Sequence, residues 1–287
     1  MRAAEWKDYT VIATGNGYKL ERWADVTLLR PDPQVIWKSR IDLDGYKGLS
    51  AKYLRSETGG GRWLIKGKMP ESWTVTYKDL KFKIKPMGFK HTGLFPEQAV
   101  NWDMMTELIK NANREINVLN LFAYTGGATV ACAKAGAKVC HVDAAKGMVE
   151  RAGENVRLSG IGDGKVRYII DDCKKFVMRE IRRGRKYDAI IMDPPSYGRG
   201  PNGEMWKIEN ELYDFVNLCV GVLSDNPLFF LINSYTTGLQ PAVLKNILTL
   251  ALKNYSGRVD AYEVGLPTEE GIALPCGAGG MFINDGK

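Results

Sequence analysis

This sequence has no long apolar run, few histidines and no paired cysteine motif, and each absence excludes a class of protein. No apolar stretch approaches the ~20 residues that a helix needs to cross a bilayer, and the first eight residues lack the apolar core of a secretory leader. With 45% hydrophobic and 25% charged residues, the composition argues against disorder, collagen and a disulfide scaffold. We therefore expect a globular cytoplasmic protein of one large or two small domains that does not contact membranes.

Cysteine and histidine are too sparse for a structural zinc site. The five cysteines stand at positions 132, 140, 173, 219 and 276, and no two are spaced as Cys-x-x-Cys. The histidines are limited to His91 and His141. Because structural zinc needs four cysteine or histidine ligands at short spacings, no metal site is expected, and reduced thiols fit the cytosol.

The net charge of +7 is concentrated in the first third of the chain. Residues 1–90 contain 18 Lys and Arg against 10 Asp and Glu, whereas residues 91–287 contain 22 against 23. A localised positive surface attracts polyanions such as RNA. A solvated surface that improves solubility gives the same count, so charge alone does not identify a partner.

The first 85 residues have the texture of short strands and turns. Stretches rich in β-branched and aromatic residues are predicted to be strands at residues 9–13, 25–29, 34–37 and 72–77, with Gly, Pro and Asp turn signals between them. Residues 81–85 alternate lysine with apolar bulk, which favours an edge strand with one solvated face. The sequence thus predicts a small, basic, β-rich domain over residues 1–85 that could bind substrate.

From about residue 97 apolar strands alternate with amphipathic helices. A helix is predicted over residues 97–110. Strands follow at residues 118–122, 138–142, 166–170, 187–192 and 228–232, with helices at 128–135, to 158, to 183, at 209–223 and to 253, and closing strands at 258–264 and 280–283. Such alternation is typical of a parallel sheet covered on both faces. The predicted fold is a doubly wound, Rossmann-like α/β domain over residues 86–287.

In this fold the ligand lies beyond the carboxyl ends of the strands, and the residues there indicate which ligand. Asp143, after the second strand, suits the two hydroxyls of a ribose, although it could instead cap the next helix. A dinucleotide site needs G-x-G-x-x-G so that backbone amides approach the pyrophosphate. Here Phe122 and Tyr124 replace the first glycines, and only Gly126 and Gly127 remain. This favours S-adenosylmethionine, which has no phosphate, over a nicotinamide dinucleotide.

Two further strand ends carry carboxylates. Asp171 and Asp172 follow the third strand and could accept the adenine amino group, or could stabilise the positive end of a helix dipole. After the fourth strand comes Asp193-Pro194-Pro195-Ser196-Tyr197. Two prolines stiffen the segment after the strand and remove two backbone N–H donors. Hydrogen-bond acceptors, the carbonyls and one carboxylate, are left at the entrance of the site. An aromatic side chain beside them could stack on a base. The loop from residue 198 to 203 carries one cation, as a loop that closes over substrate would.

These segments resemble the motif series of class I S-adenosylmethionine-dependent methyltransferases, most closely bacterial 23S rRNA base methyltransferases of the cytosine-C5 and guanine-N7 types. The likeness rests on residues 119–126, Asp143, Asp172 and residues 193–198, together with His91-Thr92-Gly93 upstream. It implies donor-binding roles for Asn120, Phe122, Tyr124, Gly126, Asp143, Ala144, Asp172 and Asp193. For the acceptor, the predicted catalytic set is Asp193, Pro194, Pro195 and Tyr197, and the predicted substrate contacts are His91, Ser196 and Arg199.

The acceptor atom decides what else the chemistry needs. Carbon 5 of a pyrimidine reacts only after a cysteine thiolate adds to the ring, and relatives that do this carry the cysteine just after the fifth strand. Residues 233–238 contain none, and Cys173 and Cys276 are the only substitutes. The sequence therefore favours nitrogen methylation of a base in ribosomal RNA. A protein or small-molecule methyltransferase, a catalytically silent nucleic-acid-binding module and a nicotinamide-dependent oxidoreductase are the alternatives.

Overall fold

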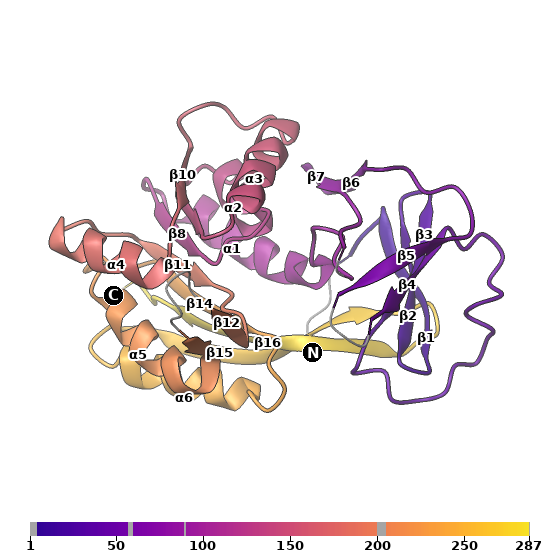
Figure 1. Ribbon diagram of the computed structural model, residues 1–287. Coiled ribbons are helices and arrows are strands. Elements are labelled where there is room, and N and C mark those ends of the chain that lie inside the picture. The colour runs from indigo at the N-terminus through magenta and orange to yellow at the C-terminus, as the bar shows by residue number, and fades with distance from the viewer. Residues whose placement is uncertain (1–4, 57–59, 89, 200–204, 287) are drawn as a thin grey trace. The chain divides into compact units, whose positions relative to one another are not determined.

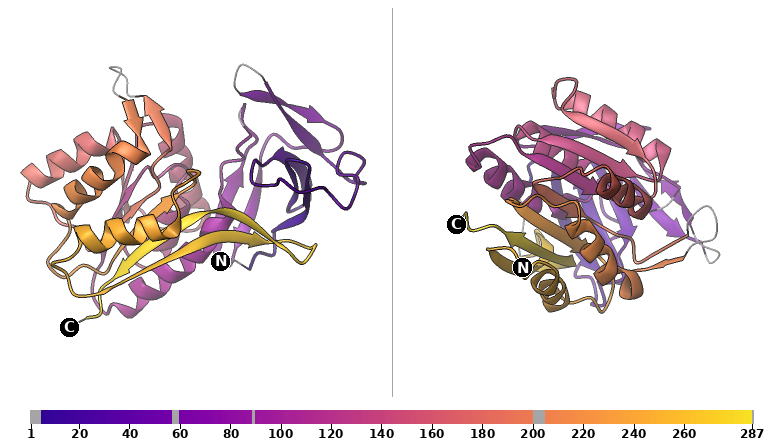
Figure 2. Two further views of the ribbon diagram at one scale, coloured as in Figure 1. Left: turned by 90° about the horizontal axis from the view of Figure 1, so that it is seen from below. Right: turned by 90° about the vertical axis from the view of Figure 1, so that its left-hand side faces the viewer.

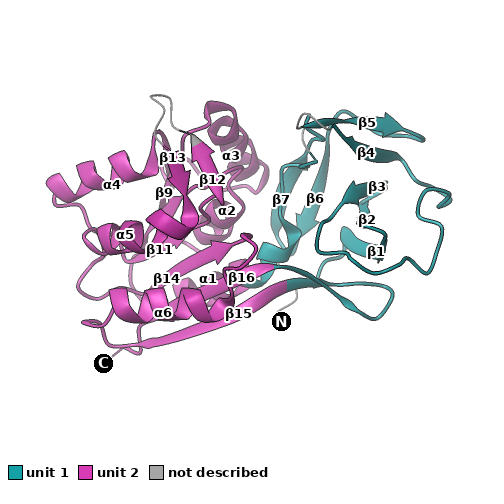
Figure 3. Cartoon of the chain, turned by 60° about the horizontal axis from the view of Figure 1, so that its bottom comes forward, with its two compact units in different colours: residues 1–100, 265–276 teal, residues 101–264, 277–287 magenta. Residues whose placement is uncertain are grey.

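The computed structural model describes residues 5–56, 60–88, 90–199 and 205–286 (Figure 1). The chain divides into two compact units, coloured separately in Figure 3. Unit 1 contains Met1–Val100 and Gly265–Cys276, and unit 2 contains Asn101–Val264 and Gly277–Lys287. Unit 1 is thus assembled from two segments that are far apart in the sequence.

Unit 1 is built from a five-stranded sheet and a separate hairpin. The sheet has the order β1-β2-β3-β4-β5, in which only β3 and β4 pair in parallel. Its strands are β1 (Tyr9–Gly15), β2 (Tyr18–Trp23), β3 (Val26–Pro31), β4 (Ala51–Arg55) and β5 (Gly61–Ile65). The hairpin joins β6 (Trp73–Tyr77) to β7 (Leu80–Ile84), and a short 3-10 helix, η1 (Pro96–Gln98), follows. In β7 the side chains of Leu80, Phe82 and Ile84 are buried while Lys81 is exposed, which confirms the strand with one solvated face.

The strand predicted at residues 34–37 was wrong. This stretch is irregular, because its carbonyls bond to a turn instead of a strand: Val35 accepts from the Gly17 N–H at 2.9 Å and Trp37 from the Asn16 N–H at 2.8 Å. The Trp37 indole N–H donates to Thr14 Oγ1 at 3.0 Å. Alternate residues therefore point inward as in a strand, which is the pattern that misled the prediction.

Strand β2 escaped prediction because its charged residues are buried. Glu21 is 0% exposed and accepts hydrogen bonds from Arg30 on β3 at 2.6 and 2.8 Å and from the Tyr9 hydroxyl on β1 at 2.6 Å. Burial disfavours the Glu21 carboxylate, but the charges of Arg30 and Lys19 outweigh it and lower the pKa of Glu21 to about 2. A buried ion pair thus replaces the apolar alternation that marks a strand.

Residues from the end of the chain cover the outer edge of β1. Val11 forms a parallel bridge with Thr268, and the Glu269 N–H donates to the Val11 carbonyl at 2.9 Å. The Glu270 carboxylate accepts from both the N–H and the hydroxyl of Thr14, at 2.7 and 2.9 Å. An uncovered edge strand is open to pairing with other chains, so these contacts complete the sheet.

Unit 2 is a seven-stranded sheet between two layers of helices. The strand order is β10-β9-β8-β11-β14-β16-β15, in which β10, β9, β8, β11 and β14 are parallel neighbours. The strands are β8 (Asn117–Leu121), β9 (Lys138–Asp143), β10 (Val166–Ile170), β11 (Ala189–Met192), β14 (Phe229–Ser234), β15 (Arg258–Pro267) and β16 (Ala273–Ile283). The helices are α1 (Ala99–Asn111), α2 (Gly127–Lys134), α3 (Lys146–Leu158), α4 (Cys173–Arg182), α5 (Ile208–Val220) and α6 (Pro241–Ala251). The predicted doubly wound α/β fold and the β-rich N-terminal part are confirmed.

The closing strands make the sheet mixed. β16 runs antiparallel to β14, with Phe230 opposite Phe282, and the two long strands β15 and β16 are the yellow arrows in Figure 2. A small hairpin of β12 (Tyr197–Arg199) and β13 (Met205–Lys207) precedes α5. Among the described residues, no helix combines the length and the apolar content needed to cross a membrane.

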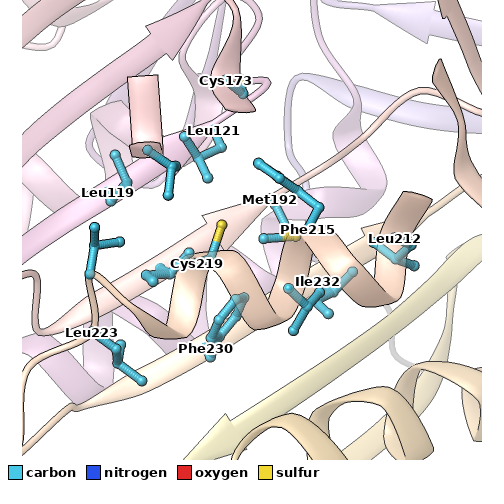
Figure 4. Close-up of a cluster of buried hydrophobic side chains, with 14 of the residues drawn as sticks. Leu119, Leu121, Cys173, Met192, Leu212, Phe215, Cys219, Leu223, Phe230 and Ile232 are labelled. Carbon is cyan, nitrogen blue, oxygen red and sulfur yellow. The ribbon is translucent and has the colours of Figure 1, made fainter. Parts of the chain in front are cut away.

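The main apolar core of unit 2 lies between the sheet and the layer of α4, α5 and α6. Strand residues such as Leu121, Met192 and Ile232 pack there against Phe215 and Cys219 of α5, as Figure 4 shows. Helices α1, α2 and α3 lie on the opposite face of the sheet (Figure 1). With both faces covered, only the ends of the strands are left to form a site.

Candidate active site

The register of the sheet brings the predicted strand-end residues into one row. Leu121 lies opposite Val142 and Met192, and Met192 lies opposite Ile232. The residues that follow these four positions are Phe122, Asp143, Asp193 and Asn233. The row lies where β9 and β11 flank β8 on either side, which is the point at which the strand order reverses and at which doubly wound folds bind ligands.

The loop after β8 has an unusual backbone. Phe122, Tyr124 and Gly126 have φ angles of 53°, 50° and 83°, so every second residue is left-handed. That conformation costs a non-glycine residue about 1–2 kcal/mol, and such strain is held where the surrounding structure demands it. At Gly126, which precedes α2, an added Cβ would lie 2.9 Å from Cβ of Ala152. A side chain is thus excluded at Gly126 by space as well as by conformation.

The amides of this loop point into the protein. The Phe122 N–H donates to Cys173 Sγ at 3.3 Å, the Ala123 N–H to the Val142 carbonyl at 3.1 Å, and the Tyr124 N–H to Asp143 Oδ2 at 2.8 Å. The Gly126 N–H donates to the Ala123 carbonyl at 3.0 Å. A pyrophosphate is bound by loop amides that face outward, and these four are already engaged. The loop therefore fits a nucleoside without phosphates and does not fit a dinucleotide.

Asp143 braces the loop. Its Oδ2 holds the Tyr124 N–H, and its Oδ1 accepts from the Ala145 N–H at 2.8 Å. The N-cap of α3 is Ala145, with no side-chain cap, so Asp143 does not cap this helix in the way the alternative interpretation supposed. Each carboxylate oxygen has two lone pairs, so Asp143 can hold the loop and still accept from ribose hydroxyls. Ala144 lies exposed beside it.

Asn120 acts beneath the loop, where it is 3% exposed. Its Nδ2 donates to Thr129 Oγ1 at 2.9 Å, and Thr129 Oγ1 lies 2.9 Å from His141 Nδ1. Burial lowers the pKa of His141 to about 4, so the ring is neutral at pH 7. Asn120 can thus affect a ligand only through the loop.

This network makes the stability of unit 2 depend on pH in a defined window. The pKa of histidine is 6.5 when exposed and about 4 for His141, so between those values the unfolded chain binds more protons, and stability falls as the pH is lowered. Between pH 6.5 and 5 we expect His141 to cost about 2 kcal/mol of unfolding free energy. Urea unfolding at both pH values should show this loss in the wild type and a smaller one in His141→Gln. Equal losses in the two proteins would contradict the assignment of this pH dependence to His141. His91 is present in both proteins, so its titration contributes equally to each loss.

Asp171 and Asp172 begin α4. Asp172 is its N-cap, and Oδ1 accepts from the Lys175 N–H at 2.8 Å. Asp171 accepts from Arg179 and, through Oδ1, from the Asp172 N–H at 2.8 Å. Capping therefore occupies one oxygen of Asp172 and leaves its predicted contact with adenine as a proposal.

The predicted acceptor loop is held by the β12–β13 hairpin, which stands out from unit 2 in Figure 2. Trp206 on β13 donates its indole N–H to the Pro195 carbonyl at 2.6 Å, and the Ile208 N–H donates to the Ser196 carbonyl at 3.1 Å. The hydroxyls of Ser196 and Thr236 are 2.6 Å apart, which ties the loop to the end of β14. The Pro194 carbonyl accepts no hydrogen bond from the part of the chain that is described.

The exposed aromatic of this loop is Tyr197. Its side chain is 47% exposed and its hydroxyl lies 3.5 Å from Met205 Sδ across the hairpin. Asp193 is half-buried at the loop's start. Arg199 lies in β12, but its side chain and the rest of the predicted closing loop, residues 200–204, lie outside the described residues.

Sequence reasoning missed Trp206, which links the two loops of the site. Its ring centroid lies 5.6 Å from that of Phe122 and 5.7 Å from that of Phe215. The Phe122 side chain therefore packs into the protein, and only its backbone shapes the loop. Asn155 on α3 was also missed, and its Nδ2 donates to the Thr125 carbonyl at 2.9 Å. Neither residue lies in a strand-end motif, so only the fold brings them to the site.

His91 belongs to unit 1. It is half-buried, its ring lies 5.5 Å from that of Phe95, and burial together with the charge of Arg30 lowers its pKa to about 4. A neutral imidazole can donate or accept a hydrogen bond but carries no charge toward a phosphate. Its predicted role in substrate binding stays a prediction.

The thiols are not activated. Cys132, Cys140, Cys173 and Cys219 are buried and Cys276 is half-buried, all as free cysteines. Burial raises the pKa of Cys140 to about 11 and raises the pKa of the other four as well. A nucleophilic cysteine needs a lowered pKa. Within the described ranges no group of three or more His, Cys, Asp or Glu could hold a metal ion.

Comparison with known proteins identifies the family of this chain. A family model described as S-adenosylmethionine-dependent methyltransferase matches residues 46–210. The chain belongs to this family. The predicted family, the enzymatic class and S-adenosylmethionine as the methyl donor are thereby confirmed.

Curated relatives of this methyltransferase are named for ribosomal RNA. Ribosomal RNA large subunit methyltransferase K/L of Shewanella frigidimarina is 32% identical over 208 residues, which are 71% of this chain and 27% of that protein. A putative ribosomal RNA large subunit methyltransferase of Methanocaldococcus jannaschii is 34% identical over 119 residues, 42% of this chain and 30% of that protein. The methyltransferase described here thus spans under a third of the length of either relative.

Among solved structures, a methyltransferase from Agrobacterium tumefaciens matches with a TM-score of 0.92 and 31% identity, over 98% of this chain and 92% of that one. A putative methyltransferase complexed with SAH matches with a TM-score of 0.77 and 16% identity, over 98% and 76% of the two chains. The second likeness supports the fold alone. The first extends over both units of this methyltransferase.

Proposed function

We propose that this methyltransferase transfers the methyl group of S-adenosylmethionine to a nitrogen atom of a nucleobase in large-subunit ribosomal RNA. The observation that carries the proposal is the acceptor loop after β11. This loop carries two hydrogen-bond acceptors, the Asp193 carboxylate and the Pro194 carbonyl. Asp193 follows Met192, which pairs with Leu121, so the acceptor loop begins beside the loop from Phe122 to Gly126, the donor loop. The large-subunit rRNA named for the relatives, at 32% and 34% identity, supports the substrate class.

Bound S-adenosylmethionine supplies a methyl group on a positively charged sulfur. Asp143 would bind the ribose, Asp172 the adenine amino group, and the backbone of the loop from Phe122 to Gly126 the methionine part. Asp193 would accept an N–H of the base and so turn the nitrogen lone pair toward the methyl carbon. The carboxylate would stabilise the positive charge that develops on the nitrogen as it takes up the methyl group, and would accept the proton that the nitrogen then releases, while the donor leaves as neutral S-adenosylhomocysteine. In such an in-line transfer most of the rate comes from alignment.

Unit 1 would hold the RNA. The excess of 18 cations over 10 anions in residues 1–90 is suited to a phosphate backbone, and half-buried His91 offers a neutral polar contact. The target base and its neighbours would be contacted by Ser196, Tyr197 and Arg199, with the Tyr197 ring stacking on the face of a base.

The test is methyl transfer from labelled donor to deproteinised large-subunit RNA taken from a strain that lacks the gene. We expect label in RNA, and nuclease digestion should release it as a nitrogen-methylated base. No label in RNA would reject the substrate class. Label at carbon 5 of a pyrimidine would reject the nitrogen acceptor while leaving RNA as the substrate.

A cysteine substitution separates nitrogen from carbon chemistry. Carbon-5 transfer needs a thiolate, and the Cys173 thiol contacts the donor loop, where its sulfur accepts from the Phe122 N–H at 3.3 Å. In Cys173→Ser the hydroxyl can still accept from that N–H, so we expect the rate of methyl transfer to stay within about threefold of wild type. Loss of transfer with donor affinity intact, or a covalent adduct with 5-fluoropyrimidine RNA, would contradict nitrogen methylation.

A further inference from the structure

A concentration of positive charge lies on unit 2, hidden by the near-neutral balance of residues 91–287. Residues 165–186 contain nine Lys and Arg against three Asp and Glu, whereas the remaining residues of that range contain 13 against 20. These 22 residues form β10, α4 and the turn that follows it. The positive charge of residues 91–287 is therefore concentrated in this one region, while the remainder of the range is acidic.

At least four of the nine cations form ion pairs: Arg179 with Asp171, Arg167 and Arg183 with Glu180, and Lys174 with Glu211 of α5. Asp171 is engaged by Arg179. Glu180 is 0% exposed and accepts from Arg183 at 3.0 Å and from the Tyr187 hydroxyl at 2.6 Å. Arg182 and Arg185 are exposed, and within the described ranges neither forms an ion pair. Their charges are directed at solvent.

Helix stability does not explain the pattern. Cations near a helix C-terminus are favourable, which accounts for Arg179 and Arg182, but Lys174 and Lys175 stand in the first turn of α4, where the helix dipole disfavours them. Lys175 and Arg179 are also four residues apart, a spacing at which like charges repel. Glu211 of α5 offsets Lys174 at 3.2 Å, so the positive charge that is left facing solvent lies at the C-terminal end of the helix, at Arg182 and Arg185.

Exposed apolar groups lie on both elements, with Met178 among the cations of α4 and Tyr168 of β10 turned toward Gly153 of α3. β10 is the outermost strand of the sheet, and on it Tyr168 is 37% and Ile170 52% exposed, while Met178 on α4 is 45% exposed. We name the surface of β10 and α4 the α4–β10 surface. It begins at Asp172, next to the strand ends that form the candidate active site, and follows α4 along the outer side of unit 2 (Figure 1). At 1.5 Å per residue, α4 extends it over roughly 15 Å.

We propose that the α4–β10 surface binds the phosphate backbone of the RNA substrate, an inference that rests on RNA being the substrate of the site described above. Phosphates pair with exposed Arg and Lys side chains, and Met178 on α4, which is 45% exposed, offers an apolar contact for a ribose. A neutral small-molecule substrate would have no use for a charged surface extending away from the strand ends.

The test compares two charge reversals of equal size. One is Arg182→Glu with Arg185→Glu, and the control is Lys245→Glu with Lys253→Glu, two exposed lysines on and just after α6. Binding to deproteinised large-subunit RNA is measured by filter retention between about 50 and 200 mM salt. For the arginine pair we expect about 30-fold weaker binding at the lower salt and a slope of log K against log salt that is shallower by about two. The lysine pair should stay within about twofold of wild type.

Calorimetry with S-adenosylhomocysteine should give the same affinity for wild type and both variants, which shows that the donor site remains folded. Arg182→Gln with Arg185→Gln avoids a negative charge at the helix C-terminus and should lose affinity for RNA in the same direction. Equal RNA binding by the arginine and lysine pairs would overturn the proposal. The proposal would also be overturned if the arginine pair bound RNA as wild type does and lost binding only to phosphatidylglycerol vesicles. If the wild type methylates RNA in the labelling assay but the arginine pair binds RNA as well as wild type does, only this inference fails. If the wild type transfers no label to RNA, the proposed function itself fails.

Discussion

Asp193→Asn is expected to lower kcat for methyl transfer about 1,000-fold, the effect of removing a positioned carboxylate from a reacting nitrogen. The amide of asparagine keeps the volume and one acceptor oxygen, but it removes the negative charge that would stabilise the developing cation. The loop itself should persist, because the hydrogen bonds from Trp206 to the Pro195 carbonyl and from Ile208 to the Ser196 carbonyl do not involve the Asp193 side chain. Single-turnover transfer to RNA measures the loss.

The matched control is Asp225→Asn. Asp225 is exposed and lies in the turn that enters β14, on the side of the sheet away from the carboxyl ends of the strands. It should leave kcat within about twofold of wild type. If Asp193→Asn retained more than a tenth of the wild-type rate, the carboxylate would have no role at the reacting atom, and acceptor alignment would have to come from other groups.

Asp143→Ala is expected to weaken binding of S-adenosylhomocysteine about 100-fold or more. It removes the acceptors of the Tyr124 and Ala145 N–H groups, both at 2.8 Å, and charge-assisted bonds of this kind contribute about 1.5–3 kcal/mol each. Tyr124 would then lose the contact that holds its left-handed backbone, with φ of 50°. Loss of the ribose partner adds to the loss of loop geometry. Isothermal titration calorimetry measures the affinity.

Asp143→Asn distinguishes the two contributions. An amide oxygen can still accept from one of the two N–H groups, so the loop should be held better than in Asp143→Ala, while the pair of ribose contacts is lost. We expect an intermediate affinity. Asp163→Asn, in the exposed turn before β10, is the control and should bind as wild type does. Wild-type affinity in Asp143→Ala would contradict both the bracing and the ribose role.

Strand ends could be located from sequence because the motifs are continuous in the chain. Asp143 and Asp193 each end an apolar run, so their place in the row of strand ends followed from the alternation of strands and helices. The bracing of the loop did not, since it depends on Trp206 and Asn155, which come from elements distant in the chain. The capping of α4 by Asp172 could be weighed but not decided, because an N-cap and a ligand contact both need an exposed carboxylate at a helix start.

Charge patterns were informative only at the right scale. The balances of residues 1–90 and 91–287 show the basic first 90 residues and hide the nine cations of residues 165–186, because acids elsewhere in residues 91–287 offset them. In unit 1 the opposite occurred, since the buried Glu21–Arg30 pair looks like solvated surface in sequence and concealed a strand. Periodicity detects apolar burial and cannot detect polar burial, which depends on partners brought together by the fold.

The covering of β1 by Thr268, Glu269 and Glu270 has a consequence for biosynthesis. On the ribosome, the first 100 residues emerge about 165 residues before this edge is completed, an interval of roughly 8–33 seconds at 5–20 residues per second. Throughout that time Val11 and Thr14 present an open β edge, the kind of surface on which nascent chains aggregate. The N-terminal sheet is thus translated first and finished last, which makes it the part of this protein with most need of a chaperone.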